Sequence, residues 1–166
     1  MALTESRAGT AGSQLNVPAP TTLDGLLGSA DHKSVGRLWI SSGLLFLVVS
    51  LGVSVVAAFE ASDLKSYSIV KSADNFTQYW SLGRELLLFG ALVPILIGLA
   101  YSIVPLQIGA PAVAFARGAA GAFWTWIMGT LLLIASYVFN GGPGGVKPDF
   151  MVLWVASLVM VLGALL

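Results

Sequence analysis

Long apolar runs separated by short polar stretches dominate the pattern of this 166-residue chain. A hydrocarbon core about 30 Å thick is crossed by roughly 20 helical residues. Four runs approach or exceed that length, and the second carries its charges, Arg84 and Glu85, close to its start. We therefore predict an all-α membrane protein, a bundle of four transmembrane helices. The predicted spans are about 38–59, 82–104, 119–139 and 150–166.

Polar and glycine-rich segments delimit these spans. Residues 1–30 are rich in Ala, Gly, Ser, Thr and Pro and lack the continuous apolar stretch of a cleavable signal. We predict a flexible N-terminal arm there, followed by the four-helix transmembrane domain over 31–166. The run from Asn140 to Gly145 contains four glycines and one proline. This composition predicts a turn between the third and fourth helices.

Composition narrows the chemistry that the chain can carry. Hydrophobic residues make up 57% of it and charged residues 10%, with eight basic and eight acidic side chains. The basic residues are scattered, so no surface offers the phosphate neutralisation that nucleic-acid binding requires. The chain has no Cys, which excludes thiolate nucleophiles and Cys-ligated metals. With His32 as its single histidine, it also has too few nitrogen ligands for a His-based metal site.

The charges that flank the first span indicate an orientation. Lys33 and Arg37 precede it, whereas Glu60 and Asp63 follow it. Basic residues favour the cytoplasmic side of a membrane. We therefore predict a cytoplasmic N-terminus, and four spans would return the C-terminus to the same side.

Arg84 and Glu85 are the ionisable residues nearest to the interior of a span. Adjacent helical residues point about 100° apart, so the two side chains are poorly placed to pair with each other. Two interpretations remain open: both side chains extend to the membrane surface, or one forms a salt bridge to a partner subunit. A transporter or channel needs further polar groups inside its spans, and almost none are present.

Small residues mark a contact face on the second span. Gly90, Pro94 and Gly98 recur every four residues, a spacing that lets helices approach closely. Pro94 lacks a backbone N–H and should kink the helix, with neighbouring groups compensating for the lost hydrogen bond. Similar spacing on the first span indicates a packing face there, formed by Ser50, Ser54 and Ala58.

Two motifs are similar to a known family. The segment Asp31-His32-Lys33-Ser34-Val35-Gly36-Arg37-Leu38-Trp39-Ile40 resembles the lead-in to the first helix of cytochrome c oxidase subunit I, the catalytic subunit of haem-copper oxidases. The segment Val104-Pro105-Leu106-Gln107-Ile108-Gly109-Ala110-Pro111 resembles the loop between that family's second and third helices. The resemblance covers about 22–166 and implies the first four helices of the family's larger bundle.

The chain departs from the family at positions that carry its chemistry. The resemblance places a haem-ligating histidine on the second helix where this chain has Gly83. The proton-uptake aspartate corresponds to Ala112, and the asparagines that follow the loop correspond to Gly118, Ala119 and Ala120. We therefore expect no catalytic residue, cofactor-binding residue or metal site in this chain. Haem and copper are expected in a partner catalytic subunit.

These features together predict a non-catalytic accessory subunit of a bacterial cytochrome c oxidase in the plasma membrane. Its expected partners are other oxidase subunits and lipids, and one arrangement open to it is a respiratory supercomplex with a cytochrome bc complex. The alternatives are an assembly factor that binds oxidase subunits transiently, a small independent transporter, and a fragment of a complete subunit I, which would require His at position 83. The candidate partner interface consists of His32, Lys33, Arg84, Glu85, Gly90, Pro94 and Gly98.

Overall fold

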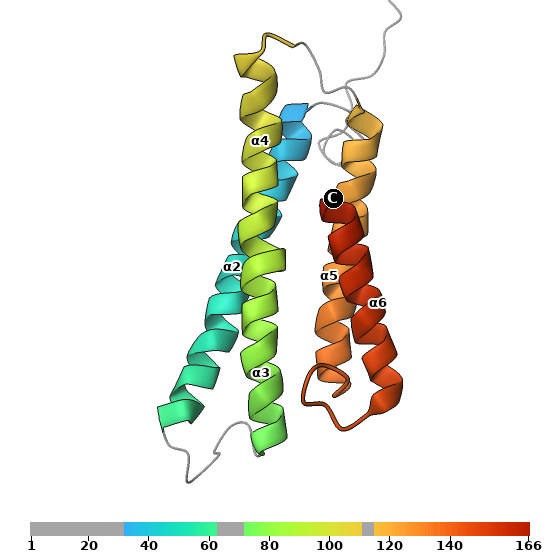
Figure 1. The fold of residues 1–166 in the computed structure, drawn as a ribbon. Coiled ribbons are helices and arrows are strands. Elements are labelled where there is room, and N and C mark those ends of the chain that lie inside the picture. The colour runs from blue at the N-terminus through green and yellow to red at the C-terminus, as the bar shows by residue number, and fades with distance from the viewer. Residues whose placement is uncertain (1–31, 63–71, 111–114) are drawn as a thin grey trace, which may run out of the picture.

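A computed structural model describes residues 32–62, 72–110 and 115–166, which form a bundle of long helices (Figure 1). The predicted arm over 1–30 and Ala112 lie outside the described residues. Four helical stretches are long and apolar enough to cross a membrane, which confirms the predicted fold class. The elements are α2 (His32–Ser62), α3 (Ala73–Glu85), η1 (Leu86–Leu92), α4 (Val93–Gln107), α5 (Ala116–Val138) and α6 (Pro148–Leu165).

Local sequence explains where several helices begin and end. Ser72 accepts a hydrogen bond from the backbone N–H of Asn75 at 3.2 Å and so caps the start of α3. Pro148 begins α6, where the backbone N–H that proline lacks would have no partner within the helix. After α5, Asn140 takes a left-handed backbone conformation with φ of 66°. The predicted turn over 140–145 is therefore confirmed.

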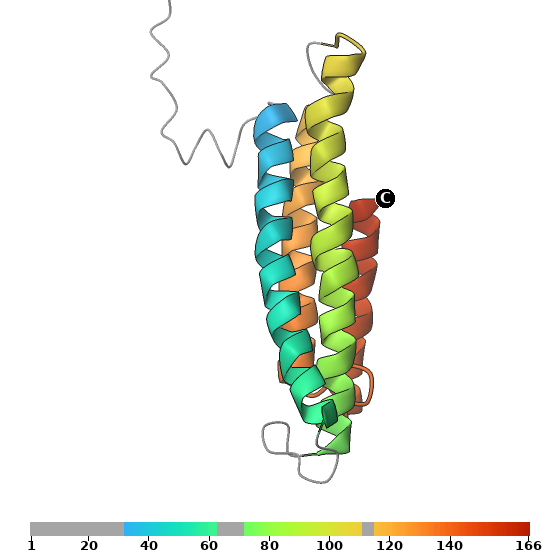
Figure 2. The ribbon, with the colours of Figure 1, turned by 90° about the vertical axis from the view of Figure 1, so that its left-hand side faces the viewer.

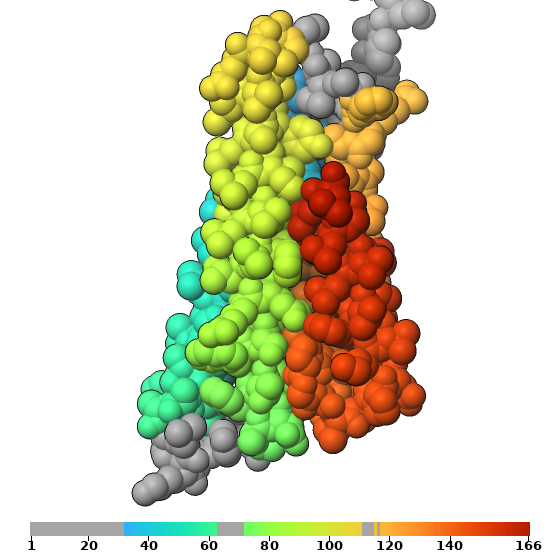
Figure 3. Space-filling view, viewed as in Figure 1, coloured from blue at the N-terminus to red at the C-terminus, as the bar shows by residue number. Residues whose placement is uncertain are grey.

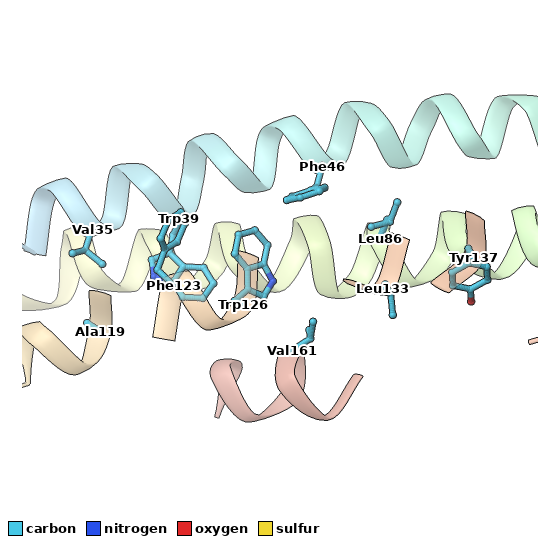
Figure 4. Packing of buried hydrophobic residues seen from close by; sticks show 10 residues of the cluster. All are labelled: Val35, Trp39, Phe46, Leu86, Ala119, Phe123, Trp126, Leu133, Tyr137 and Val161. Atoms are coloured by element: carbon cyan, nitrogen blue, oxygen red, sulfur yellow. The ribbon is translucent and has the colours of Figure 1, made fainter. Parts of the chain in front are cut away.

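The helices form two antiparallel pairs. α2 packs along the continuous helix made by α3, η1 and α4, and α5 packs along α6. Figures 1 and 2 show that α2 begins, and α6 ends, toward the same end of the bundle. Aromatic side chains join the two pairs, because Trp39 and Phe46 of α2 meet Trp126 of α5 with ring centroids 5.0 and 5.5 Å apart (Figure 4).

The bundle is covered with apolar side chains. Val48 and Val55 on α2, Leu96 on α4 and Val152 on α6 are each more than 60% exposed. Exposing such an apolar surface to water is unfavourable, whereas the apolar hydrocarbon of a bilayer can surround it. Together with the four long helices, it describes a multi-pass membrane protein.

A π-helical turn interrupts the second span in its middle. In η1 the N–H of Val93 bonds to the carbonyl of Leu88, five residues back. The next bond of this kind would join Pro94 to the carbonyl of Phe89, and proline has no N–H to donate. The indole Nε1 of Trp126 donates to this carbonyl instead, at 2.9 Å. The expected compensation for Pro94 is thus supplied by a side chain of α5.

Candidate functional site

Close contact between α2 and the second span governs the surroundings of Gly83. On α2 the contact residues Gly36, Gly43 and Ser50 follow one another at intervals of seven. Their counterparts are Gly98, Ala91 and Gly83, at intervals of seven and then eight. The additional residue lies in η1, where the wider π turn accommodates it. The register of α3 against α2 therefore depends on this turn.

Gly83 lies in direct contact with α2. The hydroxyl of Ser50 donates to the carbonyl of Gly83 at 2.8 Å, and Gly83 is buried. A Cβ atom added to Gly83 would lie 2.8 Å from Ser54 Oγ and 3.6 Å from Val53 Cγ1. A side chain at this position would thus point into α2, where the helices leave no room for it.

The residues at this position do not fit the haem that the family resemblance implies. Glycine offers no ligand, and the direction in which a side chain would leave Gly83 is blocked by Ser54. The one histidine of the chain, His32, begins α2, far along the bundle from Gly83. Within the described ranges, no three His, Cys, Asp or Glu side chains gather where they could hold a metal ion.

Arg84 and Glu85 point in different directions, as their adjacent positions require. Arg84 is exposed, and its guanidinium lies 4.5 Å from the ring centre of Trp80. This cation-π contact one turn back suits a long side chain at a membrane surface. Glu85 is partly buried and faces the other helix pair. The interpretation that both extend to the membrane surface is consistent with Arg84 but not with Glu85.

The carboxylate of Glu85 connects α3 to α6. Trp154 Nε1 donates to Glu85 Oε2 at 3.2 Å. α6 packs chiefly on α5. This charge-assisted bond is therefore one of the few polar connections between α6 and the other helix pair in the described structure.

Two side-chain amides lie near the same end of the bundle. Gln78 of α3 is buried and contacts the side chain of Asn140, which follows α5. Gly145 lies against both residues, because a Cβ there would meet Gln78 Nε2 at 2.7 Å. The glycines of this loop thus allow the turn to close over the end of α3.

The remaining members of the predicted interface lie in different surroundings. Gly90, Pro94 and Gly98 are buried on the second span, and a Cβ at Gly98 would lie 2.7 Å from the carbonyl of Gly36. The close approach that these small residues allow is therefore made within the chain, to α2. His32 is 9% exposed, whereas Lys33 is exposed. The use of any of these residues by a partner remains a prediction.

Sequence reasoning missed the interior roles of tryptophan. Trp39 and Trp126 are 1% and 0% exposed and form the aromatic centre of the bundle. Aromatic residues near the start of a span, as in the third span, are typical of anchors at the membrane surface. Trp124 suits that role better, because it is 39% exposed. The spacing of Trp126 from Leu133 and Tyr137, which share its buried face, is the signal that could have indicated burial.

Comparison with known proteins agrees with the motif resemblance. Residues 34–166 match the family described as cytochrome C and quinol oxidase polypeptide I. Cytochrome c oxidase subunit 1 of Alkalihalophilus pseudofirmus is 34% identical over 118 residues, which cover 70% of this chain and 18% of the relative. A probable cytochrome c oxidase subunit 1-alpha of Streptomyces coelicolor is 29% identical, with coverage of 70% and 20%.

A third relative extends the comparison. Heme-copper oxidase subunit I+III of Aeropyrum pernix is 29% identical over 69% of this chain and 14% of its own length. The chain thus spans about a fifth or less of the length of these three curated relatives. Since the family match covers most of the chain, this protein belongs to the family of cytochrome c and quinol oxidase polypeptide I, subunit I of the haem-copper oxidases.

Proposed function

We propose that this chain acts as a non-catalytic, structural component of a bacterial cytochrome c oxidase. Its role would be to bury helix faces against other oxidase subunits, while haem and copper are held by a partner catalytic subunit. The proposal extends to a place in a respiratory supercomplex with a cytochrome bc complex. It also places the chain in the plasma membrane with both termini in the cytoplasm.

The observation that carries this proposal is the surroundings of Gly83. The family resemblance puts a haem ligand there, yet Ser50 binds the Gly83 carbonyl and Ser54 occupies the space that a side chain would need. Restoring a histidine would thus require α2 and α3 to separate. Because a contact between helices occupies this position, the structure favours a structural role over a catalytic one.

The distribution of charge supports the proposed orientation. Lys33 and Arg37 are exposed near the start of α2, and Arg117 is exposed at the start of α5, which lies at the same end. The other two basic residues that the structure describes, Arg84 and Lys147, lie toward the opposite end, so the larger number is beside the start of α2. Basic residues beside the first helix favour the cytoplasmic side.

Affinity purification of the tagged protein from native membranes in mild detergent tests the proposal. We expect oxidase subunits to co-purify in fixed stoichiometry together with oxygen-reducing activity, and bc-complex subunits to co-purify if the supercomplex forms. Recovery with oxidase subunits only during biogenesis, and absence from the mature active complex, would instead indicate an assembly factor.

A spectroscopic measurement tests the lack of cofactors separately. The chain purified away from its partners should show no Soret absorbance and no bound copper. A stoichiometric haem signal that survives the double substitution His32→Ala and Arg84→Ala would contradict the proposal. Ion or solute transport by the isolated chain in liposomes would favour an independent transporter instead.

A further inference from the structure

A cation and two aromatic rings lie in line on the outer face of α3. Arg84 is exposed, and its guanidinium carbon Cζ lies 4.5 Å from the ring centre of Trp80, one turn nearer the start of the helix. Trp80 is 41% exposed and stacks on Phe76 another turn away, with ring centroids 6.1 Å apart. Figure 3 shows α3, η1 and α4 as one continuous column, coloured green to yellow, with no other described helix in front of it.

The N–H donors of Arg84 and Trp80 have no acceptor within the described structure. Arg84 contacts the Trp80 ring and forms no salt bridge with a described carboxylate. Glu85, the next residue, binds Trp154 of the other helix pair instead. The indole N–H of Trp80 likewise donates to no described residue. Because a guanidinium carries five N–H donors, this pair can bind an acceptor from outside the described chain.

The contact between α2 and α3 shows how deep in the membrane these donors lie. A Cβ at Gly83, which precedes Arg84, would lie 2.8 Å from Ser54 Oγ. Glu60, where charge resumes on α2, follows Ser54 by six residues, or about 9 Å. The charge-free part of α2 before Glu60 is about 33 Å long, close to the hydrocarbon thickness of about 30 Å. The backbone of Arg84 is thus about 9 Å inside the hydrocarbon, and stacking on Trp80 brings the guanidinium about 5 Å back toward the headgroups.

Large aliphatic side chains continue the face of Arg84 toward the middle of the membrane. Leu88, Leu92 and Leu96 follow it at intervals of four residues and are 46%, 47% and 64% exposed. Residues at this interval are neighbours on a helix surface. Half of a hydrocarbon core is about 15 Å thick, or about ten helical residues, which is the distance from Arg84 to just beyond Leu92. The stripe therefore spans one leaflet.

The composition of this stripe distinguishes a lipid from a partner helix. Membrane helices pack closely through small residues. The small residues of this span contact α2, as at Gly83 and Gly98, whereas the exposed stripe consists of leucines. A flexible acyl chain can adapt to such branched side chains, and a phosphate at the membrane surface can reach the donors at the end of the stripe.

We propose that this face binds one glycerophospholipid. Its phosphate accepts hydrogen bonds from the Arg84 guanidinium and the Trp80 indole, and one acyl chain lies along Leu88 and Leu92. The phosphate is recognised rather than a net negative charge, because the exposed Asp74 at the same end disfavours anionic headgroups. This inference is independent of the proposed role in an oxidase, since it rests only on the outer face of α3 and η1.

Native mass spectrometry of the full chain in detergent tests the proposal. The probes are dioleoyl phosphatidylethanolamine and dioleoylglycerol, which carry the same acyl chains but differ in the phosphate headgroup. We expect one phosphatidylethanolamine per chain at saturation, with about tenfold preference over dioleoylglycerol. Absence of this preference, or of a saturable single lipid, would overturn the proposal.

Three variants test the donors. Arg84→Gln should weaken phosphatidylethanolamine binding about tenfold, and Trp80→Phe, which keeps the stacking ring but removes the N–H, about threefold. Lys147→Gln is the matched control, because Lys147 is an exposed cation beside an aromatic ring, 5.9 Å from the ring centre of Phe150, and lies off this face before α6. It should leave affinity unchanged. Equal affinities of the Arg84→Gln and Lys147→Gln variants would refute a phosphate contact at Arg84.

Photo-cross-linking in native membranes tests whether a lipid or a protein covers the stripe. Benzoylphenylalanine, a photoreactive amino acid, replaces Leu88, which is exposed on this face. We expect the cross-linked product to be the chain joined to one phospholipid, identified by its mass. Cross-linking chiefly to a second protein would show a partner subunit on this face and overturn the proposal.

Discussion

The bond between Trp126 and the backbone of the second span gives the sharpest prediction from this structure. Trp126 is fully buried, and its Nε1 donates at 2.9 Å to the carbonyl of Phe89. Pro94 cannot donate to this carbonyl because it has no backbone N–H. Trp126→Phe would leave this carbonyl unpaired in an apolar interior. We expect a loss of about 1–2 kcal/mol in unfolding free energy from the bond. The smaller ring should cost about 1 kcal/mol more.

A double-mutant cycle separates the bond from the change in ring size. In a Pro94→Ala background, residue 94 regains an N–H that can donate to the Phe89 carbonyl. Trp126→Phe should then cost only about 1 kcal/mol, which gives a coupling of about 1–2 kcal/mol between the two positions. The effect of Pro94→Ala by itself cancels in the cycle.

Unfolding in mixed micelles of dodecyl maltoside and SDS, followed by far-UV circular dichroism, measures these differences. Trp124→Phe serves as the control for removing an indole from the partly exposed face of α5 and should change stability by less than about 0.5 kcal/mol. If Trp126→Phe costs the same in both backgrounds, Trp126 does not compensate for Pro94, and our account of the π turn is wrong.

Three further predictions concern the helix contacts. Gly98→Ala should destabilise the bundle by about 1–3 kcal/mol, because its Cβ would meet the backbone of the facing helix. Gly52→Ala is the control and should not destabilise it, because a Cβ at Gly52 meets no other atom. The same unfolding assay compares the two variants. Trp154→Phe should cost about 0.5–1.5 kcal/mol and lose most of that effect in a Glu85→Ala background; equal costs would refute the link between α3 and α6. Gly83→His should destabilise the bundle and give no Soret band on haem addition; a low-spin haem spectrum would refute the blocked position.

The number and placement of the helices could be predicted from local sequence. Each predicted span overlaps one long helix, although α2 begins six residues earlier than predicted, at His32, and the second helical stretch begins at Ala73 rather than residue 82. A count of apolar residues missed the first turns of that stretch, because they contain polar residues such as Asp74 and Gln78. A helix that continues beyond the hydrocarbon needs no apolar sequence, so hydropathy marks the membrane and not the helix end.

The candidate site could be predicted in part. The resemblance located Gly83, and the spacing of Gly90, Pro94 and Gly98 correctly indicated close helix contact. That the contact lies within the chain could not be predicted, because small residues at this spacing serve internal and external partners equally well. The inward turn of Glu85 was missed for a similar reason, since its partner is 69 residues away in sequence.

The sequence by itself determined that four apolar helices form and that a glycine-rich turn joins the last two, and its family resemblance predicts Gly83 in place of a haem ligand. These are local properties, set by the length, hydropathy and identity of neighbouring residues. Only the tertiary structure decided the register between helices, through one additional residue taken up in η1. That register places Trp126 against Phe89 and leaves the indole N–H of Trp39 buried without a hydrogen-bond partner in the described structure, because such contacts depend on how helices distant in sequence are aligned.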